Sequence, residues 1–244
     1  MRRLLAPLAL VAQRAQLKVM NAMFVYNPPT TPWLEILYRD DDLLVINKPA
    51  GLLTVPGKAP EHKDSLELRV RRALPEARIV HRLDMATSGI ILMALNKYTQ
   101  GELGKQFEHR KTTKRYRARI HGELESSSGS VDLPLRCDWP NRPKQMVCHD
   151  EGRASLTHYE KVTGTPAWTD VILHPITGRS HQLRVHMNSL GHPILGDRLY
   201  GTDASREGAT RLLLHAEYLA FTHPRTGAAM AFELPIDYSA ACLL

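Results

Sequence analysis

Two short segments of the chain are apolar at every position, and they constrain the fold more than any other feature. Residues 43–46 read LLVI, and residues 89–95 read GIILMAL. A strand with one face in water alternates apolar and polar residues, so a strand that is apolar on both faces lies inside a sheet covered on both sides. We therefore expect a central sheet with further layers packed on each face.

The rest of the pattern predicts helices and antiparallel hairpins around this sheet. Two strands flank residues 40–42, and a helix capped by Ser65 ends just before Pro75. Residues 130–153, rich in proline and polar residues, indicate an inserted arm or hairpin. Further segments are predicted as a helix over 99–109 and as strands over 115–121, 154–163, 168–174, 211–222 and 228–234. Interleaving of this kind predicts an α+β domain rather than a strictly alternating α/β fold.

A charged motif leads directly into the second apolar segment. His81, Arg82 and Asp84 precede the triplet 87–89, which reads TSG, and the buried strand follows at once. Charged groups at the mouth of a core strand cost free energy unless they are paired. These residues therefore have partners or act on a substrate. The alternative for Asp84 is a structural role as an N-cap.

The charge of the chain favours a polyanionic partner. Its net charge is +7 and its isoelectric point is near 9.4, which favour nucleic acid before a membrane surface. Three cysteines, an odd number without a CxxC motif, fit a reducing cytoplasm better than a disulfide framework. We expect a cytoplasmic protein that binds RNA and has no membrane span.

The first residues, MRRLLAPLALVAQRAQLKVMNAM, begin like a signal peptide, with Arg2 and Arg3 before an apolar stretch. Gln13 stands where a small residue is expected for cleavage after Ala15, and the apolar run is too short to span a bilayer. An over-extended start codon is an equally plain explanation. We expect residues 1–24 to be a dispensable extension, disordered or outside the fold.

A basic segment alternates strictly between two faces of a predicted strand. Arg115, Arg117 and Arg119 share one face, and Tyr116 points to the other, toward the core or a pocket. A row of guanidinium groups can follow the phosphates of RNA, although a merely solvated strand face is the alternative. We expect RNA contact on the arginine face.

The segment TGRSHQLRVHMNSLGHP, residues 177–193, predicts a short helix with Ser180 as its N-cap and Gly191 just after its end. Arg184 lies on a side where it could neutralise a buried carboxylate. His181 and His186 do not have the spacing of a helical zinc site, and no HExxH or phosphate-binding glycine loop occurs. We expect no metal and no cofactor.

Five segments together resemble the RluA family of pseudouridine synthases: VINKPAGLLTVPG, HRLDMATSGIILMA, KRYRARIHG, TGRSHQLRVHMNSLGHPILGD and RLLLHAEYLAFTHP. They occur in the family's order, and the match runs from about residue 27 to residue 238. The resemblance implies a pseudouridine synthase catalytic domain on a mixed, largely antiparallel central sheet flanked by helices and loops. It implies one such domain over 25–244, without the separate S4 RNA-binding domain of several family members.

The resemblance also implies roles for individual residues. Asp84 matches the catalytic aspartate, which either attacks the ribose covalently or removes a ribose proton; both routes stay open. Arg184 matches the buried basic partner of that aspartate, and Tyr116 the tyrosine that stacks on the target base and moves a proton. Arg82 matches the residue that enters the RNA stack. Leu213 and Leu214 are expected to line the pocket.

The segments HKDSLELRVRRALP and CDWPNRPKQMVC are most similar to the dual-specificity branch of the family. That branch modifies a hairpin-loop uridine of 23S rRNA and a uridine of the tRNA anticodon loop. We expect both stem-loops as partners of a monomeric enzyme. Two other classes remain open: a non-catalytic RNA-binding or ribosome-assembly protein, and a metal-dependent nuclease, which would need clustered carboxylates or histidines.

Overall fold

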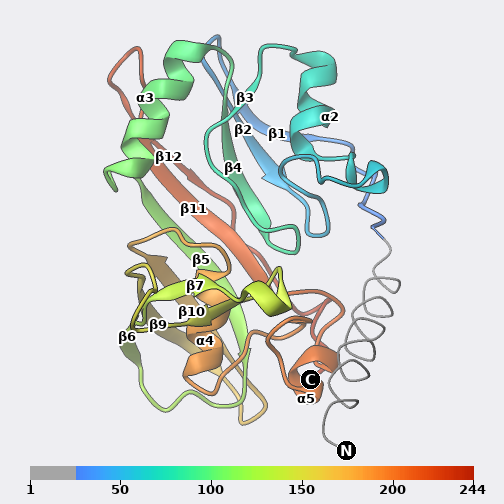
Figure 1. Ribbon diagram of the computed structural model, residues 1–244, viewed down its shortest axis with the longest axis vertical. Coiled ribbons are helices and arrows are strands. Elements are labelled where there is room, and N and C mark those ends of the chain that lie inside the picture. Colours follow the sequence, from blue (N-terminus) through green and yellow to red (C-terminus); the bar gives the residue numbers. More distant parts are fainter. Residues whose placement is uncertain (1–25) are drawn as a thin grey trace, which may run out of the picture.

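The computed structural model describes residues 26–244, which form a ten-stranded sheet and a separate two-stranded hairpin (Figure 1). The expectation for residues 1–24 lies outside this range. The strands are β1 (Glu35–Arg39), β2 (Leu43–Lys48), β3 (Arg78–Ile79), β4 (Ser88–Ala94), β5 (Thr113–His121), β6 (Ser128–Asp132), β7 (Leu135–Cys137), β8 (Gln145–Val147), β9 (Leu156–Gly164), β10 (Trp168–Pro175), β11 (Leu214–Thr222) and β12 (Ala229–Glu233). The helices are η1 (Pro60–His62), α2 (Leu66–Ala73), α3 (Lys97–Glu108), η2 (Trp139–Asn141), α4 (Gln182–Ser189) and α5 (Asp203–Glu207).

The strands of the large sheet run in the order β1-β2-β4-β11-β5-β10-β9-β6, with β3 beside β4 and β12 beside β11. Every pairing in it is antiparallel except that of β4 with β11. The prediction of a mixed, largely antiparallel sheet in an α+β fold is therefore confirmed.

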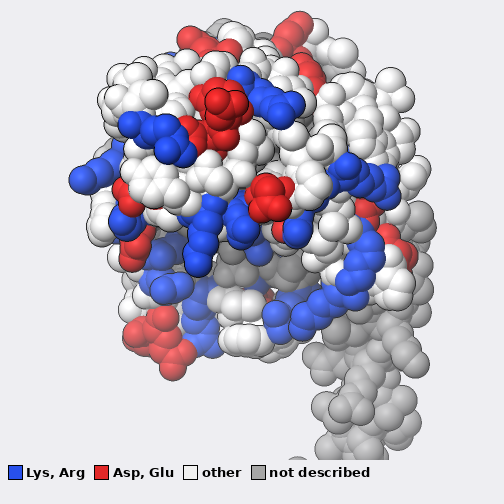
Figure 2. Space-filling view, turned by 90° about the horizontal axis from the view of Figure 1, so that it is seen from above, with Lys and Arg blue, Asp and Glu red and all other residues white. Residues whose placement is uncertain are grey.

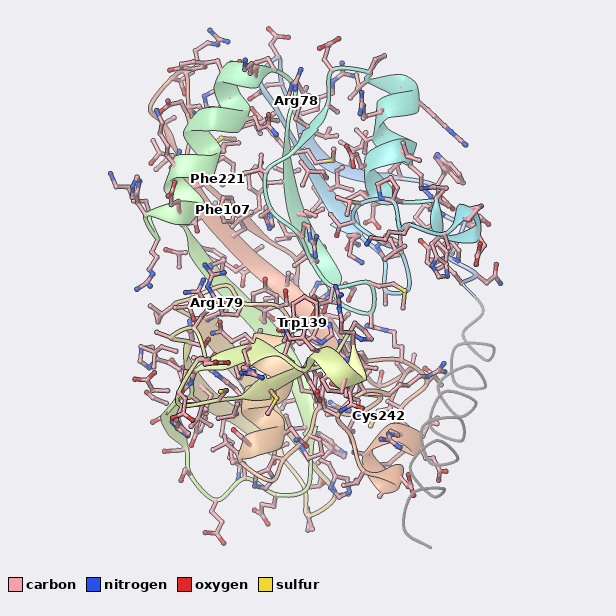
Figure 3. All side chains as sticks on the ribbon, in the orientation of Figure 1. Arg78, Phe107, Trp139, Arg179, Phe221 and Cys242 are labelled. Atoms are coloured by element: carbon pink, nitrogen blue, oxygen red, sulfur yellow. The ribbon has the colours of Figure 1, made fainter. Side chains whose placement is uncertain are left out.

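The doubly apolar segments occupy the interior, as predicted, because β2 and β4 pair with each other and bury both faces. Alternate residues enter two different cores. Leu44 and Ile91 pack with α2 on one face, while Val45 and Leu92 pack with α3 on the other. Phe107 of α3 and Phe221 of β11 belong to the second core (Figure 3). A third core lies between the far half of the sheet and α4.

The ends of the helices agree with the sequence only in part. Ser65 caps α2, because its side chain accepts a hydrogen bond from the Leu68 N–H. Gly191 follows α4 with a φ of 83°, as expected for a residue just past a helix end. The prediction of Ser180 as the N-cap of α4 is wrong. His181 takes that position with a φ of 54° and makes no capping hydrogen bond.

The predicted arm over 130–153 is shorter than expected. Its first part is β6, which pairs with β9 at the edge of the large sheet. Only β7, η2 and β8 stand apart as a hairpin (Figure 1). Trp139 in η2 is 65% exposed, and the Arg142 guanidinium lies 4.5 Å from its ring centre.

Candidate active site

A cleft lies where the parallel strands β4 and β11 begin. Ser88 at the start of β4 pairs with His215 near the start of β11, so the loop before β4 meets the beginning of β11. That loop carries Asp84, while Leu214 begins β11. Tyr116 of β5 lies opposite Ala216 of β11. The structure thus assembles one cleft from segments far apart in the sequence.

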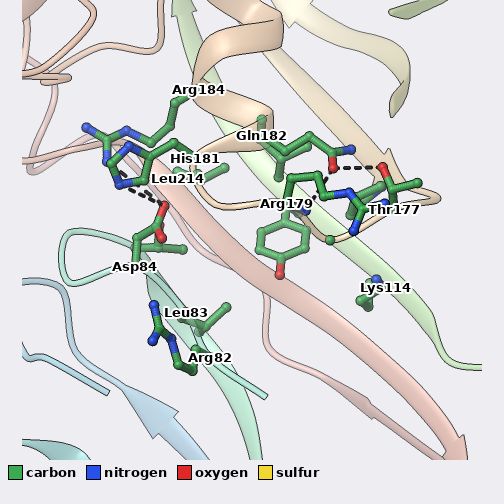
Figure 4. Close-up of a pocket in the computed structure, with 15 residues that line it drawn as sticks. Arg82, Leu83, Asp84, Lys114, Thr177, Arg179, His181, Gln182, Arg184 and Leu214 are labelled. Carbon is green, nitrogen blue, oxygen red and sulfur yellow. Dashed lines mark hydrogen bonds and ion pairs between the residues drawn. The ribbon is translucent and has the colours of Figure 1, made fainter. Parts of the chain in front are cut away.

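The cleft contains most of the predicted site residues. Arg82, Asp84, Tyr116 and Arg184 all line it, together with Leu214 (Figure 4). Leu213 does not: it is fully buried in the core, where its N–H donates to the Leu195 carbonyl and its carbonyl accepts from the Arg119 N–H. The prediction for Leu213 is corrected on this point: it lies just before β11 and its side chain packs in the core, whereas that of Leu214 faces the cleft.

The carboxylate of Asp84 is only partly covered and stands near two basic side chains. Its side chain is 27% exposed, and its Oδ2 lies 3.9 Å from Arg184 Nη1 and 3.9 Å from His181 Nε2 (Figure 4). These separations exceed hydrogen-bond length, so the interactions are electrostatic. Both oxygens of Asp84 are left available to a substrate.

Arg184 makes its hydrogen bonds to a different carboxylate from the expected one. Its Nε and Nη2 donate to the two oxygens of Asp197 at 2.8 and 2.7 Å, and both side chains are buried. Burial alone would raise the pKa of Asp197, but the hydrogen bonds and charge of Arg184 outweigh it and hold that pKa below its usual value. Arg184 therefore neutralises Asp197 first and Asp84 at longer range.

Asp197 was missed as a site residue, although it lies within the quoted motif GHPILGD. The available signal was a carboxylate directly after a buried apolar segment, which needs a basic partner as much as Asp84 does. Its Oδ1 also accepts hydrogen bonds from the N–H groups of Leu199 and Tyr200. It thereby fixes both the guanidinium of Arg184 and the turn that carries Tyr200.

His181 lies between Asp84 and the hairpin formed by β7 and β8. Its Nδ1 lies 2.7 Å from the Tyr200 hydroxyl, and that hydroxyl accepts a hydrogen bond from the Gln145 N–H of β8. Burial lowers the pKa of His181, although the charge of Asp84 works against this, and burial raises the pKa of Tyr200 to about 12. His181 is therefore neutral at neutral pH, and its orientation depends on the arm.

Tyr116 faces inward, as the alternation predicted. Ala118 and Ile120, on the same face of β5, are fully buried, while Tyr116 is partly buried at the cleft. Burial raises the pKa of Tyr116 above its usual value, and the negative charge of Asp84 raises it further. The hydroxyl is therefore protonated at neutral pH and can donate a hydrogen bond.

Two buried basic groups hold the loop that carries Asp84. Lys48 is fully buried, and its Nζ donates to the carbonyls of Pro49, Leu52 and Met85 at 2.9, 2.8 and 3.1 Å. Burial lowers the pKa of Lys48 to about 7, against the opposing charge of Asp84. Lys48 was not predicted as a site residue, although it lies in the motif VINKPAG.

His81 anchors the other end of the loop. Its Nε2 accepts a hydrogen bond from the Leu92 N–H at 3.0 Å, and its ring stacks on Phe107. Burial, together with the charge of the nearby Lys114, lowers the pKa of His81 to about 3. The charged motif before β4 is thus divided by function: His81 is neutral and structural, Arg82 is exposed, and Asp84 faces the cleft.

The predicted RNA-facing row of arginines is engaged within the protein. Arg115 pairs with Glu217 and Glu233, and Arg117 lies 3.5 Å from Glu217. Arg119 is only 8% exposed and donates twice to Asp170, with its guanidinium 3.7 Å from the ring centre of Trp168. Arg119 is buried and paired, so its guanidinium is not free to bind phosphate. Arg115 and Arg117 are paired but partly exposed, and RNA contact by these two stays a prediction.

Among residues 26–244, no group of three or more His, Cys, Asp or Glu side chains is arranged to hold a metal ion. Within the same range, none of the helices combines the length and apolar character that crossing a bilayer requires.

Comparison with known proteins agrees with the geometry of the cleft. Residues 42–189 match the RNA pseudouridylate synthase family. The dual-specificity RNA pseudouridine synthase RluA of Escherichia coli (strain K12) is 56% identical over 214 residues, covering 87% of this chain and 98% of that protein. The enzyme of the same name from Vibrio cholerae is 52% identical over 217 residues, covering 89% of each chain.

Solved structures show the same architecture. Human RNA pseudouridylate synthase domain containing 1 superposes with a TM-score of 0.68 at 31% identity, covering 87% of this chain and 85% of that chain. Human RNA pseudouridylate synthase domain containing 4 superposes with a TM-score of 0.67 at 24% identity, covering 83% of this chain and 88% of that chain. This second match supports the fold. The chain therefore belongs to the RNA pseudouridylate synthase family, whose members convert uridine in RNA to pseudouridine.

Proposed function

We propose that Asp84 is the catalytic carboxylate of this pseudouridine synthase, acting on a uridine that has left the RNA stack and entered the cleft. The reaction breaks the N-glycosidic bond, turns the uracil, and rejoins it to the ribose through carbon, with a proton moved from that carbon to nitrogen. Atoms and electrons balance without a redox step. A positioned carboxylate and a site that keeps the free base in place are what the reaction requires.

One observation carries this proposal: the Asp84 carboxylate faces the cleft without a hydrogen bond from any described residue, while two basic groups stand 3.9 Å away. Arg184 places a positive charge next to the carboxylate. Its free oxygens can approach the ribose. Covalent attack on the ribose and removal of a ribose proton both need a carboxylate whose oxygens are not taken up by other hydrogen bonds.

The other residues fit roles around the base. The ring of Tyr116 offers a stacking surface within the same cleft, and its protonated hydroxyl can take part in the proton movement as a donor. Arg82 is exposed at the rim, where it can replace the flipped nucleotide in the RNA stack. Arg184 holds the charge balance at longer range.

The substrates we propose are a hairpin-loop uridine of 23S rRNA and a uridine of the tRNA anticodon loop, because the two most similar enzymes described above are dual-specificity synthases. The proposal includes a monomer working in the cytoplasm, consistent with its three free cysteines. It treats residues 25–244 as a single catalytic domain, so removal of residues 1–24 should leave modification unchanged.

Replacing Asp84 tests the proposal directly. Asp84→Asn keeps the size of the side chain and removes its charge, so we expect no detectable pseudouridine in either stem-loop while the melting temperature stays normal. Asp41→Asn, at an exposed position, is the control. Pseudouridine is read by carbodiimide labelling, in EDTA, with chain cleavage monitored. Turnover of Asp84→Asn above a few per cent of wild type would place the chemistry elsewhere.

Tyr116→Phe separates the ring from the hydroxyl. Stacking of the ring, about 1–3 kcal/mol per base, should survive, so RNA affinity and melting temperature should stay near normal. Turnover should fall severely, because the proton donor is gone. Wild-type turnover of Tyr116→Phe would reduce Tyr116 to a stacking platform.

A further inference from the structure

Two basic side chains that line the cleft, and two more whose charges act on them, have no acidic partner among the described residues. They are Arg110, Lys114, Arg153 and Arg179, called here the rim cluster. None of them forms an ion pair with any carboxylate of residues 26–244. The Arg179 Nε donates only to the Ala154 carbonyl, at 3.2 Å. The neighbouring Arg115, Arg117 and Arg119 differ sharply, because each of them is bound to Glu or Asp.

The rim cluster comes from three segments that meet at the cleft. Lys114 and Arg179 line the same cleft as Asp84 (Figure 4). A Cβ placed on Gly178 would be 3.9 Å from the Lys114 Nζ, so the ammonium lies against the loop that carries Arg179. The hydrogen bond to Ala154 brings Arg179 beside Arg153. Arg110 follows α3, four residues before Lys114.

The positive charges are close enough to disturb each other. Burial lowers the pKa of Lys114, and the charge of Arg110 lowers it further. Burial also lowers the pKa of Arg179, and Arg153 and Arg110 both add to that effect. An arrangement of like charges without a counterion is unfavourable in the free protein, and an anion relieves it. Lys and Arg side chains border a hollow on the face shown in Figure 2.

Tyr116 gives the position of the anion relative to the base. Lys114 and Tyr116 are two residues apart on β5 and therefore on the same face, about 7 Å from each other. If uracil stacks on Tyr116, the sugar–phosphate chain of the same nucleotide must leave the cleft past the rim. The rim cluster then stands where the backbone next to the flipped uridine passes.

We propose that Arg110, Lys114, Arg153 and Arg179 form a phosphate-binding site that grips one backbone phosphate beside the flipped uridine. This inference rests on the proposed function, since it takes RNA as the ligand and the cleft as the place of the base. The rim cluster touches no reacting atom. It holds the nucleotide in register with Asp84.

The test combines the removal of charge from the protein with the removal of charge from single phosphates of the RNA. The RNA is a tRNA anticodon stem-loop in which each loop phosphate in turn is replaced by an uncharged methylphosphonate. The proteins are wild type, the double variant Lys114→Gln/Arg179→Gln, and Arg39→Gln as control. Arg39 is exposed on β1, which β2, β4 and β11 separate from β5. Affinity is measured by fluorescence anisotropy over a series of salt concentrations.

We expect one methylphosphonate position to weaken wild-type binding about tenfold, because hydrogen bonds to charged groups are among the strong ones. The double variant should bind unmodified RNA correspondingly more weakly and lose nothing further at that position. Its salt dependence should be shallower by up to about 0.7 in log–log slope per lost contact. Arg39→Gln should behave as wild type in all three measurements.

Two results would overturn the phosphate site: equal losses at every position in wild type and double variant, or a double variant with unchanged affinity and salt slope. Pseudouridine formation is measured separately on the same RNA. A coupled phosphate without any pseudouridine would reject the proposed function and keep the binding site. Pseudouridine formation without a coupled phosphate would reject the phosphate-binding site and keep the proposed function.

Discussion

At the residue scale, one guanidinium serves two carboxylates with different tasks. Arg184 is hydrogen-bonded to Asp197, which is 1% exposed, and stands 3.9 Å from Asp84, which is 27% exposed. The buried Asp197 holds the Arg184 guanidinium in position, and this guanidinium places positive charge near the more exposed Asp84. The Asp84 carboxylate thus has a positive charge nearby and no hydrogen bond from a described residue, so its oxygens are open to the substrate, as its proposed chemistry needs.

This division predicts unequal effects on stability. Arg184→Met leaves Asp197 charged and buried, so we expect a loss of about 3–5 kcal/mol in the free energy of unfolding. Asp84→Asn removes no hydrogen bond and should change stability by less than about 1 kcal/mol. Urea unfolding of both variants measures the difference. If Asp84→Asn destabilises the protein as much as Arg184→Met, the pairing with Asp197 is not the one that matters.

At the element scale, the parallel pairing of β4 and β11 decides where the cleft opens. Gly89 makes this pairing possible. Its φ is 114°, and a Cβ there would be 2.3 Å from the Ala216 carbonyl oxygen and 2.6 Å from the Ala216 nitrogen. Only glycine lets the two backbones approach so closely. The third residue of the TSG triplet after Asp84 is therefore a glycine for a structural reason, the close approach of β4 and β11.

Gly89→Ala should separate β4 from β11. We expect a loss of at least about 1–3 kcal/mol in stability, from backbone strain and overpacking, together with loss of turnover. The matched control is Gly101→Ala in α3, where no atom lies within 4 Å of the added Cβ. That change should stabilise the protein by about 0.5–1 kcal/mol. Thermal melts that rank the two variants in the opposite order would contradict the close approach.

At the scale of the whole molecule, neutral histidines join segments that lie far apart in the sequence. His215 lies between the Ser88 hydroxyl of β4, at 2.8 Å, and the Leu234 carbonyl after β12, at 3.0 Å. Burial lowers the pKa of His215 to about 4; the hydrogen bond to Leu234 opposes this shift, and the charge of Arg211 adds to it. His81 joins the loop before β4 to α3 in the same uncharged form.

These histidines predict how stability depends on pH. Their pKa values are lower in the folded protein than the usual 6.5, so between about pH 6.5 and pH 4 the unfolded chain binds more protons. The free energy of unfolding should therefore fall as the pH falls through this window, by up to about 1.4 kcal/mol per pH unit for each histidine. Urea unfolding at several pH values measures the slope.

His215→Gln should make that slope shallower, because glutamine cannot take up the proton. His149→Gln, at an exposed position on the arm, should leave it unchanged. An identical slope in wild type and His215→Gln would show that another group controls acid stability in this range.

The sequence by itself determined what depends on local pattern. The strands that are apolar on both faces, the capped helix α2, the inward face of Tyr116 and the motif around Asp84 all follow from residues within a few positions of each other. Periodicity decides which face of a strand or helix is buried, and it is the same wherever the element is placed. The motifs in their order were enough to indicate the family.

Only the tertiary structure decided which charges meet. Glu217 lies 102 residues from Arg115, Asp170 lies 51 from Arg119, and Asp197 lies 13 from Arg184. A row of arginines has the same local pattern whether it faces RNA or carboxylates. The partner of each charge is set by strand order and by the chain that folds over it, because electrostatic interactions act through space and not along the sequence. The rim cluster depends on the tertiary structure for the same reason. The fold brings its basic side chains together from separate segments and places no carboxylate of the described residues in an ion pair with them.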